Sequence, residues 1–414
     1  MRTGAAAGLL FLVALVIFGG AAKRVPYWGD ENDCLIAARY FRYLFIDHDI
    51  LNPDWGDSYW THTHPMLTRY LVGGWLWARG YSLDPPLRRY DFSISLADNN
   101  RKGRIPSDAL ISEARVPMVW LAAGSVVLLY LLGSTLGGAV AGLTAATLAL
   151  ASPLAGEHLV RAMTDGPLAF FLLLSTLLGV VVARRALSDA GSFSFGWSVA
   201  LGVGLGLALA TKLTAFLGLL AVLVWVVLVA VTAGRGAARG WLLAVAIAVA
   251  VFVASDPHLY PNPIVHTLHL FQERMGDEML RQREAPRSAV RRPLDRPGLV
   301  VTESLVDGTI TGSHGVPLEA GLATVGVVAL LAKGWRGWRQ TGRLPVEGFV
   351  LLTALVYYAG ISANLYNFNP RYLLPTFLLG ALLSGVGLAV IVRWFALTPR
   401  SALTPTSLPS RERG

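Results

Sequence analysis

Ten long apolar stretches divide the sequence, and this feature constrains the fold more than any other. A bilayer core about 30 Å thick is crossed by about 20 apolar residues in an α-helix, so each stretch predicts one membrane span. Hydrophobic residues make up 54% of the 414 residues and charged residues only 15%, which predicts an all-α, polytopic membrane protein. The predicted spans are 5–22, 116–133, 136–152, 166–183, 195–211, 213–232, 240–255, 316–332, 347–364 and 372–392.

Two of the predicted turns depend on length alone. The apolar stretches 116–152 and 195–232 are too long for one crossing, so each must fold back, near Gly133-Ser134 and near Lys212 respectively. An error of one span at either place would invert the orientation of everything that follows.

Basic residues set the predicted orientation. With the N-terminus in the cytoplasm, the short inner segments are rich in arginine and lysine, as the positive-inside rule requires. These inner residues are Arg184, Arg185, Arg235, Arg239, Lys333, Arg336, Arg339, Arg343, Arg393, Arg400, Arg411 and Arg413. The net charge of +9 is therefore interpreted as topology and headgroup attraction, and no nucleic-acid partner is expected.

The outer side receives two long loops, 23–115 and 256–315, and short turns near 153–165, 212 and 365–371. Apolar residues recur at helical spacing over 32–46, 65–79 and 264–279, which predicts surface helices in the first and fourth outer loops. We expect residues 1–393 to form one integral membrane domain, with loop 256–315 covering its site. Residues 394–414 are expected to be a disordered cytoplasmic tail.

Polar residues that suit catalysis gather on this outer side, and their one-sidedness suggests an active site. The predicted catalytic residues are Asp30 and Glu31, directly after the first span. The predicted substrate-binding residues are His64, Arg161, Asp165, Lys212, His258, Tyr260 and Arg371.

Asp30 follows a helix end by one short linker, so its depth is fixed near the headgroups. A partly desolvated carboxylate at that depth can take a proton from a hydroxyl, and Glu31 can raise or share its basicity. The alternative is that Asp30 caps the helix beginning near Asn32. The sequence favours neither interpretation.

The other candidates also have structural alternatives. His64 precedes a surface helix, and the alternative to substrate binding there is a cap or a headgroup contact. Arg161 and Asp165 are spaced to form a helix salt bridge instead of binding substrate. Lys212 is the only charge between Phe195 and Arg235, and an ionisable group at such a depth indicates function unless it extends to the headgroups. Arg371 suits a phosphate, held by two parallel hydrogen bonds, or a lipid anchor.

One reaction uses these groups together. Glycosyl transfer from a lipid phosphate needs a base for the acceptor hydroxyl, cations for the departing phosphate and a route for the lipid tail. A phosphate leaving group needs little protonation, so one carboxylate suffices. Asp30 would be the base, Arg371 and Lys212 would bind the phosphate, and attack opposite the phosphate would invert the anomeric centre.

The sequence resembles the polyprenyl-phosphate-dependent glycosyltransferases of the GT-C type, which include protein O-mannosyltransferases and lipid A aminoarabinose transferases. The segments that carry the resemblance are Tyr27-Trp-Gly-Asp-Glu31, His64-Pro65, Glu113-Ala-Arg-Val-Pro117, Arg161-Ala-Met-Thr-Asp165, Ala210-Thr-Lys212 and Pro370-Arg-Tyr-Leu-Leu-Pro375. The resemblance implies that the aspartate at Asp30 is the catalytic base and that basic groups hold the carrier phosphate. It also implies a polyprenyl-phosphate-linked sugar donor, a lipid, glycan or protein acceptor, and a site on the extracytoplasmic face of the plasma membrane.

Some features depart from this pattern. Asn32-Asp33-Cys34 stands where the family usually has an aromatic or basic residue, and the familiar His-Pro-Pro is His64-Pro65-Met66.

No cofactor is expected. A metal bound among Asp30, Glu31, His64 and Asp165 stays open, although no ligand spacing supports one. The competing class is a transporter or flippase of lipid-linked sugars, which usually has midplane ionisable residues and related halves, and neither appears in the sequence.

Overall fold

The computed structural model describes residues 2–56, 58–188, 195–284, 288–309, 311 and 316–397. Within these residues, eight helices are long and apolar enough to cross a membrane. They are α1 (Arg2–Arg24), α7 (Asp108–Gly137), α10 (Asp165–Ser188), α12 (Phe216–Ala233), α13 (Arg235–Ala254), α16 (Leu318–Thr341), α17 (Val346–Asn364) and α18 (Leu374–Leu397).

The remaining two predicted spans correspond to shorter apolar helices, α8 (Ala139–Ala151) and α11 (Phe195–Leu209). All ten predicted apolar stretches therefore form helices, although ten crossings are not confirmed because α8 and α11 are short. The predicted tail boundary at residue 393 lies within α18, which continues to Leu397, and residues 398–414 lie outside the described residues.

Both expected fold-backs occur. The first lies a few residues after Gly133-Ser134, at Gly138, whose positive φ of 85° suits a residue without a Cβ. The second surrounds Lys212: α11 ends at Leu209, and a 3₁₀ turn (Leu213–Ala215) leads into α12. Lys212 thus stands at a break between two apolar helices.

The C-terminal end of α7 is held by three cations from three other helices. Arg184 of α10 donates to the carbonyl of Thr135, Lys333 of α16 to Leu136 at 3.2 Å, and Arg393 of α18 to Gly137 at 2.7 Å. The last carbonyls of a helix have no partner within it and carry its negative dipole end, so cations there satisfy and stabilise them.

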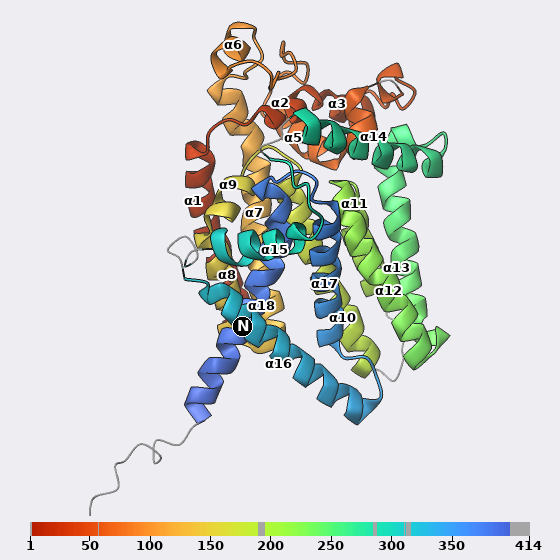
Figure 1. The fold of residues 1–414 in the computed structure, drawn as a ribbon. Helices are drawn as coiled ribbons and strands as arrows, with labels where there is room; N and C mark the ends of the chain where they lie inside the picture. Colours follow the sequence, from red (N-terminus) through yellow and green to blue (C-terminus); the bar gives the residue numbers. More distant parts are fainter. Residues whose placement is uncertain are drawn as a thin grey trace, which may run out of the picture.

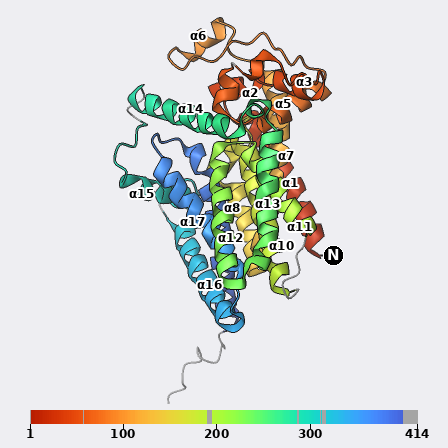
Figure 2. The ribbon, with the colours of Figure 1, turned by 90° about the vertical axis from the view of Figure 1, so that its right-hand side faces the viewer.

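Short helices form a layer over the opposite end of the bundle (Figure 1, Figure 2). From the first outer loop they are α2 (Gly29–Ile36), α3 (Arg39–Phe45), α4 (Tyr59–Thr63), α5 (Leu67–Ala78) and α6 (Leu96–Arg101), and from the other long loop α14 (Pro263–Glu284). The predicted surface helices thus exist, with the first divided into α2 and α3. Their apolar faces form two small cores, one shared with α7 around Leu35, Val72 and Met118 and one around Tyr40, Trp55 and Tyr70.

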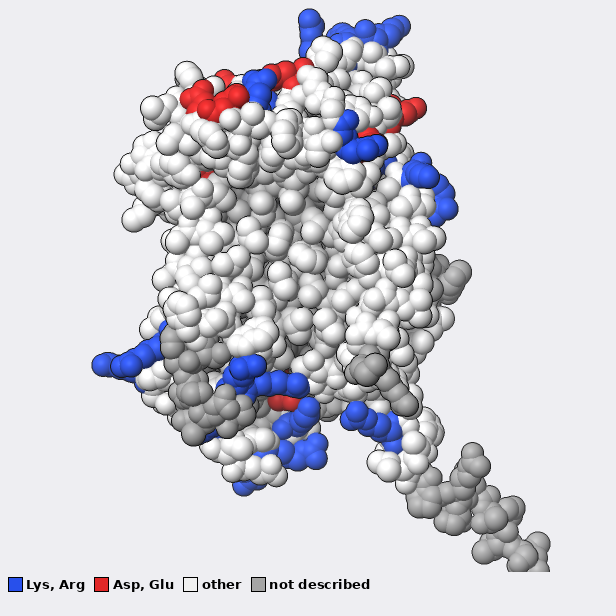
Figure 3. All heavy atoms as spheres, turned by 180° about the vertical axis from the view of Figure 1, so that it is seen from behind, with Lys and Arg blue, Asp and Glu red and all other residues white. Residues whose placement is uncertain are grey.

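Three shorter elements complete the long loops and turns. Helix α9 (Pro153–His158) precedes α10, while α15 (Asp295–Thr302) and a π-helical turn (Glu303–Asp307) pack against α17 and α18. The face drawn in the space-filling view has an uncharged band with charged residues above and below it (Figure 3). Large apolar side chains of α12 and α13, such as Val227, Val231 and Leu242, are exposed, as expected for helices whose solvent is lipid. The protein is therefore a multi-pass membrane protein.

Candidate active site

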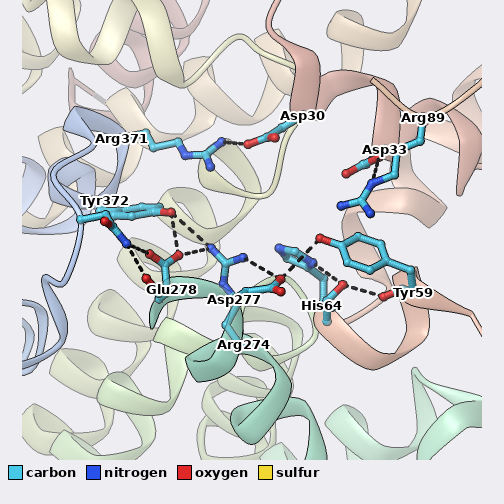
Figure 4. Close-up of polar contacts among 12 residues, drawn as sticks. Asp30, Asp33, Tyr59, His64, Arg89, Arg274, Asp277, Glu278, Arg371 and Tyr372 are labelled. Atoms are coloured by element: carbon cyan, nitrogen blue, oxygen red, sulfur yellow. Dashed lines mark hydrogen bonds and ion pairs between the residues drawn. The ribbon is translucent and has the colours of Figure 1, made fainter. Parts of the chain in front are cut away.

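A polar cavity of about 520 Å³ lies between the outer layer and the ends of the long helices. Its lining carries five cationic side chains against two carboxylates. The lining residues are Asp30, Asp33, Cys34, Tyr59, His64, Arg69, Met163, Thr164, Lys212, Arg274, Arg281, Arg371 and Tyr372. Four predicted site residues, Asp30, His64, Lys212 and Arg371, therefore line one cavity. Figure 4 shows Asp30, His64 and Arg371 of this set.

Asp30 is in the first turn of α2 and faces Arg371. Helix α2 begins at Gly29 with Trp28 as its N-cap residue, and the Trp28 N–H donates to Glu31, so Asp30 is not the cap of this helix. An Asp30 carboxylate oxygen lies 2.5 Å from Nη1 of Arg371, which comes from the 3₁₀ turn Pro370–Leu373 before α18. Burial tends to raise the pKa of Asp30, but Arg371 and Arg281 outweigh it and lower the pKa below its ordinary value.

Glu31 points away from this cavity into a buried ion pair with Arg115 of α7. Its two oxygens accept from Nε and Nη2 of Arg115 at 2.7 and 2.6 Å, and one also accepts from the backbone N–H of Ala162 at 2.9 Å. Arg115 donates its remaining hydrogens to carbonyls at the end of α1, including those of Ala22 and Val25. These contacts tie α1, α2, α7 and the segment before α10 together beside Asp30.

Lys212 pairs with Asp165 at 2.6 Å, at the start of α10. Both side chains are nearly buried, and the Lys212 ammonium also lies 5.0 Å from the ring centre of Tyr372. The pair is close to Arg371, whose guanidinium lies 5.3 Å from the same ring. Tyr372 therefore stands between the two cations predicted to hold a phosphate.

Helix α14 supplies a second set of charges that the sequence interpretation missed. Arg274 donates to Glu278 at 2.7 Å and to the Tyr372 hydroxyl at 3.2 Å, and that hydroxyl donates to Glu278 at 3.0 Å. Arg281, two turns beyond Arg274, also lines the cavity. A sequence signal existed, because Arg274, Glu278 and Arg281 recur at helical spacing beside the apolar stripe of 264–279.

A third group closes the side formed by the first outer loop. Arg89 lies 3.7 Å from Asp33, and its guanidinium stacks on the ring of Tyr59 at 3.6 Å from the ring centre. The Tyr59 hydroxyl reaches Asp277 of α14 at 3.5 Å, which links the two long loops. Burial lowers the pKa of His64 well below its ordinary value, so this cavity residue stays neutral near pH 7.

Five of the predicted residues lie outside the cavity lining: Glu31 and Asp165, whose ion pairs are described above, and Arg161, His258 and Tyr260. Arg161 pairs with Glu157 at 2.7 Å and stacks on Trp28, so the proposed Arg161–Asp165 salt bridge is wrong. His258 is buried, with Nδ1 2.9 Å from the carbonyl of Trp55. Tyr260 is 41% exposed and donates to the carbonyl of Ala254. Substrate binding by these three residues remains an untested prediction.

An apolar groove of about 1050 Å³ adjoins the polar cavity. The two share His64, Lys212, Arg274 and Tyr372. The groove continues between α12, α14 and α17 along the side chains of Phe216, Leu217, Phe271, Met275 and Ile361. A charged head in the cavity can therefore continue into a long apolar tail in the groove.

The described residues contain no group of three or more His, Cys, Asp or Glu side chains arranged to hold a metal ion. Asp30 and Asp33 lie in the cavity, but Glu31 and Asp165 each face a cation instead of a common centre. The described residues therefore offer no ligand set for a metal ion, and whether the protein requires a metal stays untested.

Known proteins share this fold. ArnT from Cupriavidus metallidurans bound to undecaprenyl phosphate aligns with a TM-score of 0.54 and 17% identity, over 94% of this chain and 60% of that chain. The oligosaccharyltransferase AglB from Archaeoglobus fulgidus, in complex with an inhibitory peptide and a dolichol-phosphate, aligns with a TM-score of 0.58 and 13% identity, over 96% of this chain and 52% of that chain. An oligosaccharyltransferase from Archaeoglobus fulgidus in complex with Zn and sulfate aligns with a TM-score of 0.60 and 12% identity, over 95% of this chain and 50% of that chain.

These likenesses confirm the GT-C-type fold predicted from the sequence motifs. The chain spans about half to three fifths of the length of these solved structures. Residues 108–260 match the model of the family described as dolichyl-phosphate-mannose-protein mannosyltransferase. No curated protein sequence matches the chain.

Proposed function

We propose that this protein transfers a sugar from a polyprenyl-phosphate carrier to an acceptor hydroxyl. The observation that carries the proposal is the continuity of the cationic cavity with the apolar groove. An excess of cations suits a phosphate, whereas an apolar groove between membrane helices suits an isoprenoid chain. The protein would act on the extracytoplasmic face of the plasma membrane. The positive-inside rule, applied to the arginines and lysines of the short loops, predicts that the layer of short helices lies on that face.

Arg371 and Lys212 are proposed to receive the phosphate. Each is held by a carboxylate in the structure, at 2.5 Å for Arg371 and 2.6 Å for Lys212. Arg274 of α14 reaches the same space and holds Tyr372 in place. In the transition state these groups would stabilise the negative charge that develops on the departing phosphate oxygens.

Asp30 is proposed as the general base. While Arg371 is bound to it, its pKa is lowered and it is a weak base. A donor phosphate that binds Arg371 would compete with Asp30 for the guanidinium, and release from this pair would raise the basicity of Asp30. Asp30 would thereby become a stronger base only when a carrier phosphate is bound. Attack by the acceptor from the side opposite the phosphate would invert the anomeric centre.

Glu31 is better placed to position the site than to react. It is fully buried and accepts hydrogen bonds from Arg115 and two backbone N–H groups. We propose that it fixes the direction of α2, and with it the position of Asp30. The roles of Arg161, His258 and Tyr260 would likewise be indirect, through the segments they hold around the cavity.

The test is transfer of a labelled sugar from a polyprenyl phosphate by the purified protein in lipid nanodiscs. Asp30→Asn should abolish transfer while carrier binding persists, because the isosteric amide cannot accept the proton. A loss of about 100-fold or more is expected from removal of a general base. Asp98→Asn, on the exposed α6, is the matched control. Undiminished transfer by Asp30→Asn would remove the base assignment, and lipid movement without transfer would favour a flippase.

A further inference from the structure

Asp33 is the one carboxylate of the polar cavity besides Asp30, among the described residues that line it. The two residues lie three positions apart on α2, which places their side chains on the same helix face with about 5–6 Å between their Cβ atoms. Both side chains line the same polar cavity, so water in that cavity can connect them. Asp33 also stands where the sequence departs from the GT-C pattern.

The two carboxylates have different partners. Asp30 is bound to Arg371 at 2.5 Å. The Oδ1 of Asp33 is instead buried without a hydrogen bond of good geometry, and its neighbours are Nε of Arg89 at 3.7 Å and the side chain of Trp60, which lowers its pKa. A buried carboxylate oxygen without a hydrogen-bond donor destabilises the fold, so its presence indicates that the oxygen binds a donor during function. A proton, held directly or through water, would satisfy it.

We propose that Asp33 is the second proton acceptor of the site. It receives from Asp30 the proton that Asp30 takes from the acceptor hydroxyl. This inference rests on the proposed function. In the transfer, the acceptor O–H bond breaks while the acceptor oxygen bonds to the anomeric carbon. The bond between that carbon and the phosphate oxygen breaks, and its electron pair stays on the phosphate. The proton passes from Asp30 through cavity water to Asp33 and then to solvent.

The electrostatics give the transfer a direction. Burial raises the pKa of Asp33 to about 6, an effect that Arg89 opposes and that Asp30 reinforces, whereas the pKa of Asp30 lies below its ordinary value. While Arg371 is paired with Asp30, a proton is therefore more stable on Asp33 than on Asp30, and transfer of the proton to Asp33 lets that pair form again. The titratable or charged groups that act on Asp33 are Asp30 of its own helix, Arg69 of α5 and Arg89, and its charge acts in turn on Tyr27, Cys34 and Tyr59.

The experiment measures transfer rates from about pH 5 to about pH 8, using the same labelled polyprenyl-phosphate sugar. Asp33 accepts a proton only when it is ionised, so the wild-type rate should fall as the pH falls through about 6. Asp33→Asn should be about 10- to 100-fold slower near pH 7 and should lose this acid limb. Its carrier affinity should not fall, because Asp33 pairs with Arg89 and not with Arg371 or Lys212. Asp33→Glu should restore part of the rate, and Asp98→Asn serves as the surface control.

Arg89→Met is a second variant that keeps the carboxylate. Because Arg89 lowers the pKa of Asp33, its removal should move the acid limb to higher pH. A wild-type rate and acid limb in Asp33→Asn, or an unmoved limb in Arg89→Met, would overturn the assignment while leaving the proposed function intact. Absence of transfer by the wild-type protein would instead remove the proposed function, and the proton path with it.

Discussion

The buried pair of Glu31 and Arg115 makes a strong prediction about the stability of the outer layer. Their side chains are 0% and 4% exposed, and they are joined by two hydrogen bonds of 2.7 and 2.6 Å. Glu31→Ala would leave the Arg115 charge without a counter-ion and the N–H groups of Trp28 and Ala162 without acceptors. Breaking one side of a buried ion pair typically costs about 3–5 kcal/mol, and we expect a loss in that range.

Thermal unfolding in nanodiscs, read by near-ultraviolet circular dichroism, measures this loss. Each kcal/mol shifts the melting temperature by about 2–4 °C in chains of about 200 residues, and by less in a longer chain. The expected shift is therefore several degrees. The control is Asp98→Ala, whose partner Arg101 is 78% exposed, and it should change the melting temperature little.

The same variant separates a positioning role from a catalytic one. If Glu31 positions α2, then Glu31→Ala should lower both the melting temperature and the transfer rate. If Glu31 reacts directly, the rate should collapse while the protein melts as the wild type does. A melting temperature equal to that of the Asp98→Ala control would refute the reasoning about the buried pair.

Two further predictions concern helix packing and carrier binding. Gly387 of α18 packs so closely on α16 that an added Cβ would overlap the carbonyl oxygen of Leu322. The melting temperature of Gly387→Ala should therefore lie well below that of the wild type. Gly321 on α16 has open space around it, so the melting temperature of Gly321→Ala should equal or exceed that of the wild type. Equal melting of the two variants would contradict this. Arg371→Ala should weaken polyprenyl-phosphate binding about 10- to 100-fold, measured by titration, since it removes charge-assisted hydrogen bonds of about 1.5–3 kcal/mol; an unchanged affinity would mean that Arg371 only anchors its helix.

The spans could be predicted from the sequence because membrane helices are local features. Length and hydropathy located all ten apolar helices, and the isolated charge of Lys212 marked a real break between α11 and α12. The order of polar residues along one side of the membrane also brought Asp30, Lys212 and Arg371 to the same cavity. These predictions needed only periodicity and the thickness of a bilayer.

The remaining features of the site depend on contacts between distant segments. Glu31 and Arg115 are 84 residues apart, and no local pattern shows that they meet. Arg274 and Tyr372 are 98 residues apart, so the contribution of α14 becomes visible only when the second long loop is placed over the cavity. Sequence spacing also favoured a salt bridge between Arg161 and Asp165, but closer partners, Glu157 and Lys212, satisfy both side chains.

The three cations on the last carbonyls of α7 have a mechanical consequence. Because α10, α16 and α18 are each bound to the C-terminal end of α7, these four helices are held together at that point. Separation of the helices is therefore restrained at the end of the bundle opposite the layer of short helices. Basic residues of the kind that favour a cytoplasmic position thus also cross-link the finished bundle.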